Sequence, residues 1–218
     1  MKVLFCSYRQ WAANVLAAIA PCFPNILFEH VDTPERLLER HKSYEHPIVI
    51  VAGWSWKVPT SIVNSSYVVG IHPSDLPAYA GGSPIQHQIL DGLRESVVTL
   101  FKLSEKLDAG LIVSKREYSL EGHLDKVLEN IAEASSILIR SFLENWPNIT
   151  TTEQTAAPPT RKRLKPESSK LQKNEIATMT TRQLWDTIRC HEHPYPNVYI
   201  EDDVGKLTII SVKFEPKM

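Results

Sequence analysis

The sequence predicts an α/β protein: an open, twisted, mostly parallel sheet flanked by helices, with a small C-terminal α+β extension. Apolar runs at 2–7, 48–52 and 67–72 have the length and the β-branched content of buried strands. The run IVIVA at 48–52 is apolar at every position, as in a central strand that is covered on both faces. Helical patterns separate these runs along the chain, and this alternation is typical of βαβ units in a parallel sheet.

Helices are predicted where apolar residues recur at helical spacing. This pattern covers 9–20, and Thr33-Pro34 is typical of an N-cap followed by the first residue of a second helix. The longest helix is expected over 123–145, where the large apolar residues fall on one side. Further strands are expected at 26–31, 97–103 and 111–118, and a further helix at 83–91, before Gly92.

The composition divides the chain into three segments. Residues 1–146 carry the alternating strands and helices and are expected to form the main domain. Residues 147–178 are rich in Thr, Pro, Lys and Ser and predict an extended linker. Residues 179–218 predict a small subdomain with a helix at 181–189 and strands near 198–200 and 207–214. So few strands are not stable alone, so we expect them to pack on the main domain or on a second subunit, as in a homodimer.

The charge and the composition disfavour several classes of protein. The chain has 24 basic and 25 acidic residues and a formal net charge of −1, which does not direct it to nucleic acid or to an anionic membrane. It has no apolar stretch of roughly 18 to 20 residues, and its three cysteines lack CxxC spacing, so we expect a cytoplasmic protein without a disulfide framework. The dinucleotide motif GxGxxG is absent, as are GxxxxGK[ST] and GxSxG.

The densest pattern of functional residue types lies between Gly70 and Gly110. It reads GIHPSDLPAYAGGSPIQHQILDG, then a predicted strand, then SEKLDAG. His72 directly follows an apolar strand, at the kind of strand end where open α/β sheets bind their ligands. Asp108 follows the next strand in a Leu-Asp-Ala-Gly turn. Two titratable side chains at neighbouring strand ends are able to converge on one substrate atom.

This pattern resembles the folate-dependent formyltransferase family. The matching motif is HPSxLPxYxGGSPIxxxIxxG followed by LDAG, and the resemblance runs from Lys2 to about Asn145. The later segment IRCHEHPYPNVYIED is similar to the sugar-modifying members, so the chain is most similar to sugar-nucleotide amine N-formyltransferases. The resemblance implies an enzyme that uses N10-formyltetrahydrofolate as formyl donor and a small-molecule amine as acceptor. The balanced charge adds the expectation of no nucleic-acid or membrane partner.

The resemblance also implies catalytic roles. The acceptor amine attacks the formyl carbonyl, His72 assists the developing oxyanion or moves the amine proton, and Asp108 orients His72 and relays protons. Family members carry an asparagine as oxyanion donor where this chain has Gly70, and loss of one such donor typically costs roughly 100- to 1000-fold in turnover. Asn14, Asn64 or a backbone amide are the alternative donors.

The remaining site residues are implied by position within the same resemblance. The cofactor-binding residues are expected to be Trp54, Ser55, Trp56, Lys57, Val58, Ser104 and Leu107. The substrate-binding residues are expected to be Tyr8, Arg9, Ser74, Tyr79, Gly81, Gly82 and Arg163. Arg163 belongs to the basic run 161–165, which is either a solvated charge run or an arm that contacts the phosphates of a sugar nucleotide.

The acceptor most favoured by the sequence is an amino sugar carried on a nucleotide. A methionyl-tRNA formyltransferase-like enzyme with a reduced C-terminal domain is an alternative, although residues 201–203 are acidic and suit nucleic acid poorly. A second alternative is a catalytically impaired paralogue that binds folate or a sugar nucleotide, as Gly70 suggests. The cluster Cys190-His191-Glu192-His193 lacks the ligand spacing of a helical metal site, so no metal is expected.

Overall fold

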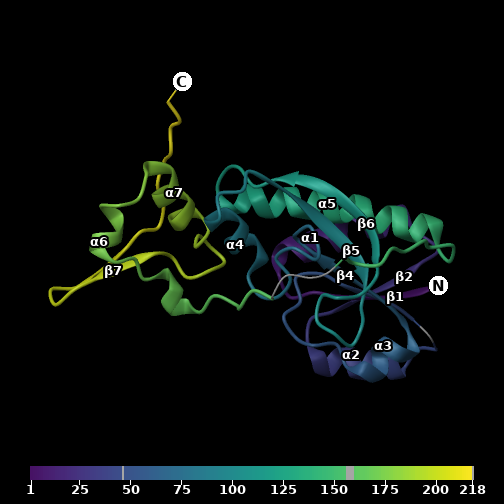
Figure 1. Cartoon of the computed structure of the whole chain (residues 1–218). Coiled ribbons are helices and arrows are strands. Elements are labelled where there is room, and N and C mark those ends of the chain that lie inside the picture. Colours follow the sequence, from purple (N-terminus) through teal and green to yellow (C-terminus); the bar gives the residue numbers. More distant parts are fainter. Residues whose placement is uncertain (46, 156–159, 218) are drawn as a thin grey trace.

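The computed structural model describes residues 1–45, 47–155 and 160–217. Its centre is a six-stranded sheet with the order β2-β1-β3-β4-β5-β6 (Figure 1). The strands are β1 (Lys2–Cys6), β2 (Leu27–Val31), β3 (Ile48–Val51), β4 (Tyr67–His72), β5 (Glu95–Lys102) and β6 (Ile112–Ser119). The first four pair in parallel and the last two join antiparallel, so the predicted mostly parallel α/β sheet is confirmed.

Helices cover both faces of this sheet. On one face lie α1 (Gln10–Ile19) and α5 (Leu124–Asn145), and on the other lie α2 (Pro34–Lys42) and α3 (Thr60–Ser65) (Figure 1). The larger apolar core fills the space between the sheet and the α1–α5 layer, and a smaller core lies under α2 and α3. Because β3 is covered on both sides, all four of its residues are buried, as its uninterrupted apolar run predicts.

The antiparallel direction of β5 changes how Asp108 reaches His72. His72 pairs with Thr99, whereas Lys102 at the end of β5 pairs with Val69. The carboxyl ends of β4 and β5 therefore point to opposite edges of the sheet, and the expectation of neighbouring strand ends is wrong. Asp108 reaches His72 because the loop between β5 and β6 folds back toward the end of β4.

The C-terminal extension forms a separate lobe beside α4 (Pro84–Leu90) (Figure 1). It contains α6 (Lys173–Ile176), α7 (Thr181–Arg189) and the hairpin of β7 (Tyr199–Glu201) and β8 (Lys206–Thr208). The predicted strand at 207–214 is wrong beyond Thr208. The amide of Ile209 still donates to the carbonyl of Val198 at 2.8 Å, and Ile209 and Val212 pack on a small core around Leu171, Ile188 and Val198.

The described parts of the segment predicted as an extended linker contact both lobes, whereas residues 156–159 of that segment lie outside the described residues. Thr152 forms an isolated bridge with Ile112, and Arg161 forms one with Gly81. A short 3-10 helix, η2 (Pro166–Ser169), follows, and Lys170 then pairs with Tyr199. Residues 160–166 therefore lie in a fixed place along the 80–83 loop.

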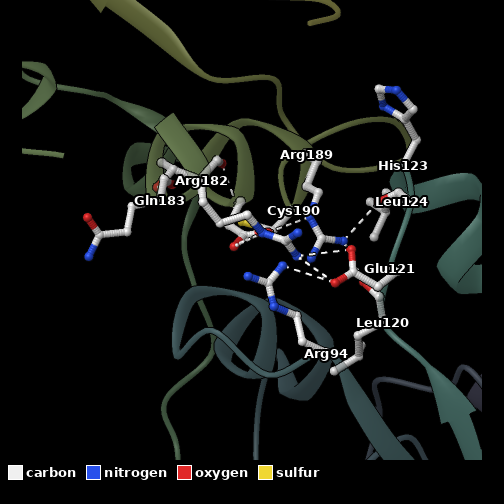
Figure 2. A network of polar contacts seen from close by, with 12 residues as sticks. Arg94, Leu120, Glu121, His123, Leu124, Arg182, Gln183, Arg189 and Cys190 are labelled. Atoms are coloured by element: carbon white, nitrogen blue, oxygen red, sulfur yellow. Dashed lines mark hydrogen bonds and ion pairs between the residues drawn. The ribbon is translucent and has the colours of Figure 1, made fainter. Parts of the chain in front are cut away.

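A buried polar network fastens α7 to the main domain (Figure 2). The Arg189 side chain is fully buried, and its guanidinium donates to the carbonyls of Leu120 and Gly122 at 2.6 and 2.9 Å and to Asp186 at 2.7 Å. Arg94, directly before β5, and Arg182, on α7, both pair with Glu121 (Figure 2). We refer to this network as the α7 clamp.

Within the described part of the chain, no helix combines the length and the apolar character needed to cross a membrane.

Candidate active site

A pocket of about 810 Å³ opens at the carboxyl ends of β1, β3 and β4. The β3–α3 loop forms one wall, the β5–β6 loop a second, and the 80–86 segment with residues 160–166 a third. The C-terminal lobe closes it with His191, Tyr195 and Pro196. Most of the predicted site residues line it: Tyr8, Arg9, Trp54, Ser55, Trp56, Lys57, Val58, Gly70, His72, Gly81, Gly82, Ser104, Leu107, Asp108 and Arg163.

His72 and Asp108 face one another inside this pocket. The nitrogen Nδ1 of His72 lies 3.7 Å from Oδ2 of Asp108, and the two side chains are 8% and 13% exposed. The nitrogen Nε2 of His72 lies 3.0 Å from the carbonyl oxygen of Tyr79. Since a carbonyl only accepts, Nε2 carries the proton of the neutral ring. The lone pair of the neutral ring is therefore on Nδ1, beside the carboxylate.

Asp108 is held in place by backbone contacts. Its Oδ2 accepts a hydrogen bond of 2.8 Å from the amide of Gly81, and its backbone has a φ of 50°, in the left-handed region. The side chain of Gln154 donates to the carbonyls of Asp108 and Gly110, both at 2.8 Å. Asp is among the few non-glycine residues that tolerate this backbone conformation, and these contacts fix the carboxylate toward His72.

Gly70 lies on β4 where apolar side chains fill the adjacent space. A Cβ atom there would lie 2.7 Å from Cδ1 of Leu103 and 3.0 Å from Cε1 of Phe101. The missing asparagine side chain therefore leaves no empty space, because the start of the β5–β6 loop occupies it. Neither Asn14 nor Asn64 is among the described residues that line the pocket.

Aromatic and basic side chains meet at one side of the pocket. Tyr8, 37% exposed, packs on Trp56 with ring centres 4.8 Å apart, and its hydroxyl contacts Ser55. Arg163 donates to the same Ser55 hydroxyl at 3.0 Å. The guanidinium of Arg9 lies 4.8 Å from the Tyr8 ring centre. Strand ends and the 160–166 segment, distant in sequence, thus build one wall.

Two arginines of this wall carry uncompensated charge. Most arginines in the described residues pair with a carboxylate, as Arg161 does with Asp91 at 2.6 Å. Arg9 and Arg163 form no ion pair with any described residue, and both line the pocket. Guanidinium groups placed in this way favour a ligand with anionic oxygens.

Two predicted substrate-binding residues lie outside the pocket lining. The Ser74 hydroxyl is fully buried and donates to the carbonyl of Ala78 at 2.7 Å. The Tyr79 hydroxyl donates to Asp91 at 3.0 Å, and burial, followed by this contact, raises the pKa of Tyr79. Ser74 therefore shapes the loop, and Tyr79 contributes its backbone carbonyl to His72.

The sequence reasoning missed several lining residues. These are chiefly Trp11, Gln86, Phe101, Leu103, His191 and Tyr195. The tail segment HPYP gave a signal for Tyr195, whereas nothing in the pattern distinguishes His191 from its neighbours. Among the described residues, no group of three or more His, Cys, Asp or Glu side chains is arranged to hold a metal ion. Glu192 instead pairs with His123 at 2.7 Å.

Comparison with known proteins decides the family. Residues 18–139 match the family model described as formyl transferase, which is more than half of the chain. The chain belongs to the formyl transferase family. A methionyl-tRNA formyltransferase of Lysinibacillus sphaericus is 29% identical over 185 residues, which cover 81% of this chain and 58% of that protein. The chain thus spans between half and three fifths of the length of two curated methionyl-tRNA formyltransferases that it matches.

Solved structures share the fold of this formyl transferase family member. Methionyl-tRNA formyltransferase from Clostridium thermocellum aligns with a TM-score of 0.86 and 21% identity, covering 99% of this chain and 94% of that one. A 4-N formyltransferase from Francisella tularensis aligns with a TM-score of 0.73 and 17% identity over 99% and 98% of the chains. HypX from Aquifex aeolicus, in complex with tetrahydrofolic acid, aligns with a TM-score of 0.74 and 18% identity over 92% and 36%.

Proposed function

We propose that the protein transfers a formyl group from N10-formyltetrahydrofolate to the amine of a nucleotide-linked amino sugar. The observation that carries the proposal is the shared pocket of the His72–Asp108 pair and the unpaired guanidiniums of Arg9 and Arg163. The pair supplies proton transfer, and the guanidiniums suit a diphosphate. A formyl acceptor whose amine is carried on a phosphorylated group needs both features.

The pocket fits a folate on the side of the β3–α3 and β5–β6 loops. Apolar walls from Phe101 and Leu103 and the ring of Trp54 suit a flat heterocycle, and Trp54 Nε1 is a buried donor without a partner among the described residues. An unpartnered buried donor is rare unless a ligand or water satisfies it. Bound there, the folate supplies the formyl group. Trp54, Trp56 and the loop 104–107 would hold it.

His72 is placed to take the proton that the amine loses as its nitrogen bonds to the formyl carbon. The free lone pair of Nδ1 is the acceptor, since Nε2 is engaged by Tyr79. The carboxylate of Asp108, 3.7 Å away, stabilises the resulting imidazolium. That imidazolium then holds the proton for the nitrogen that departs from the formyl carbon, so the proton count balances.

The acceptor side of the pocket lies beside the basic and aromatic wall. Arg9 and Arg163 would contact the diphosphate, as proposed for the 161–165 arm, and the exposed ring of Tyr8 offers a stacking surface for a base. Arg161 forms an ion pair with Asp91, so Arg163, and not the whole basic run 161–165, would bind the phosphates.

Methionyl-tRNA is the second candidate acceptor, because the curated relatives carry that name. Specific features of this chain disfavour it. The tail lysines Lys170 and Lys173 pair with Glu201 and Asp202 at 3.1 and 2.5 Å. The lobe next to the pocket therefore offers little net positive charge for a phosphate backbone.

The experiment is a competition between acceptors. The protein is incubated with N10-formyltetrahydrofolate and, separately, with thymidine- and uridine-diphosphate-linked amino hexoses or with initiator methionyl-tRNA. Formyl transfer to a nucleotide-linked sugar and none to the tRNA is expected. Transfer to the tRNA alone would replace the proposed acceptor, and transfer to neither, with folate still bound, would favour the impaired paralogue.

A further inference from the structure

His191 forms part of the pocket wall, yet half of its ring has no partner. The side chain is 5% exposed, and its Nδ1 lies 2.9 Å from the carbonyl oxygen of Thr187. Since that carbonyl only accepts, Nδ1 carries a proton. Burial lowers the pKa of His191 below its ordinary value, so the ring is neutral near pH 7.

The other ring nitrogen, Nε2, is therefore a hydrogen-bond acceptor. It is buried, and no donor among the described residues reaches it. Buried acceptors in native proteins nearly always have a partner, from the protein, from water or from a ligand. His191 lines the pocket, and a donor carried by a ligand bound there would satisfy Nε2.

The position of His191 is fixed from both sides along the chain. Two residues before it, Arg189 is fully buried in the α7 clamp and holds the carbonyls of Leu120 and Gly122 (Figure 2). Directly after it, Glu192 accepts from the amide of Leu124 at 3.0 Å and contacts His123 at 2.7 Å. A binding group anchored in this way is preorganised.

His191 lies on the acceptor side of the pocket. Tyr195, four residues later in the same segment, also lines the pocket, and the guanidinium of Arg9 lies 5.2 Å from its ring centre. Arg9 in turn packs on Tyr8. The tail segment thus meets the wall assigned above to the diphosphate.

We propose that His191 is an acceptor-binding residue whose Nε2 accepts a hydrogen bond from a hydroxyl of the amino sugar. This inference rests on the proposed function and adds to it a contact that recognises the sugar. A site built to bond a hydroxyl discriminates strongly against an analogue that lacks it, since the buried acceptor is then left unpaired. His191 would therefore set which amino sugars the enzyme accepts.

The test compares two substitutions with opposite expected effects. His191→Asn places an amide NH₂ near Nδ1, which keeps the bond to Thr187 and removes the Nε2 acceptor. His191→Gln is longer and places an amide oxygen near the position of Nε2. His193→Asn is the matched control, because His193 is exposed in the same segment and does not line the pocket.

Steady-state kinetics are measured with N10-formyltetrahydrofolate and the best thymidine- or uridine-diphosphate amino hexose. We expect His191→Asn to lower kcat/KM for the sugar about 10- to 100-fold with an unchanged KM for the folate, and His191→Gln to recover part of the loss. Calorimetry should show the same loss in affinity for the sugar conjugate and none for the bare nucleoside diphosphate. The proposal would be overturned if His191→Asn impaired the kinetics with folate as much as with the sugar. It would also be overturned if kcat/KM for the sugar were no lower than in His193→Asn.

A second readout does not depend on turnover. Long-range ¹H–¹⁵N correlation spectra of the free protein report the tautomer of each histidine, and we expect Nδ1–H for His191. If the wild-type protein formylates none of the sugars, the proposed function fails, whereas the tautomer of His191 separately tests whether Nε2 is an acceptor. A proton on Nε2 would contradict the acceptor role.

Discussion

The carboxylate of Asp108 lies 3.7 Å from Nδ1 of His72, slightly beyond hydrogen-bonding distance. The opposite edge of the imidazole is tied to the Tyr79 carbonyl at 3.0 Å. One nitrogen is thus fixed as a donor, and the other faces a negative charge. The arrangement suits His72 as a general base, because the carboxylate of Asp108 stabilises its protonated form.

We expect His72→Ala to reduce kcat roughly 10²- to 10⁴-fold, the usual contribution of a general base. Asp108→Asn keeps an oxygen that accepts from the Gly81 amide but removes the negative charge. This variant should therefore also lower kcat while the protein stays folded. Initial rates and melting temperatures would be measured together. Asp32→Asn, on an exposed ion pair, is the control. Full activity of both His72→Ala and Asp108→Asn would remove this pair from the mechanism.

Arg163→Ala should raise KM for a nucleotide-linked acceptor by roughly 10- to 100-fold, the worth of a charge-assisted hydrogen bond. Arg163→Lys should restore little of it, because an ammonium cannot bind two oxygens side by side as a guanidinium does. Arg116, exposed on β6 and outside the pocket lining, provides the control substitution Arg116→Ala. KM values at two ionic strengths would check the result, since added salt should weaken the wild-type interaction more.

Gly70→Asn is expected to destabilise the protein instead of restoring an oxyanion donor. The new side chain would overlap Leu103 and Phe101, and overpacking of this kind costs about 1–3 kcal/mol. The double variant Gly70→Asn with Leu103→Ala should recover part of that stability in urea unfolding. If Gly70→Asn alone were as stable as wild type and had a higher kcat, the side chains of Leu103 and Phe101 would have moved aside at little cost.

The α7 clamp should contribute strongly to stability. Among the described residues, Arg189→Ala leaves Asp186 with Arg182 as its one ionic partner and leaves the carbonyls of Leu120 and Gly122 without this donor. Removing one member of a buried pair costs about 3–5 kcal/mol. Arg36→Ala, on an exposed pair with Asp32, should cost less than about 0.5 kcal/mol. Urea midpoints and limited proteolysis near α7 would distinguish these outcomes. Equal midpoints would contradict a structural role for the clamp.

The lowered pKa of His191 should make the stability of the protein depend on pH. The pKa of this histidine is lowered from 6.5 in the folded protein, so the unfolded chain binds its proton first as the pH falls. The free energy of unfolding should therefore drop below about pH 6.5, by at most roughly 1.4 kcal/mol per pH unit for this one group. His191→Gln should flatten that part of the curve in urea titrations between pH 5 and 8. An unchanged slope would mean that His191 titrates normally.

Much of the fold was predictable because its signals are local. The buried run of β3 and the apolar side of α5 are both set by short-range periodicity, and the structure places them within a residue or two. The strand expected at 207–214 ends at Thr208, and its apolar residues Ile209 and Val212, three positions apart, pack on the small core around Ile188 without a strand's alternation. Periodicity indicates which side chains are buried and does not indicate whether a neighbouring strand is present.

Site residues that belong to the sequence motif could be predicted from the sequence. Residues that only the folding of the chain brings to the pocket could not. His72 and Asp108 lie in the motif and meet in space. The pairing of Arg163 with Ser55 joins residues 108 positions apart, and His191 reaches the pocket through the α7 clamp. Contacts of this range depend on how the tail docks, which no local pattern encodes.

The central claim is tested most directly by following the formyl carbon itself. ¹³C-labelled N10-formyltetrahydrofolate is incubated with a thymidine- or uridine-diphosphate amino hexose and the wild-type protein, and the products are analysed by mass spectrometry. We expect one labelled formyl group on the amino sugar, and almost none with His72→Ala. No label on any nucleotide-linked sugar, or the same amount of label with His72→Ala, would contradict it.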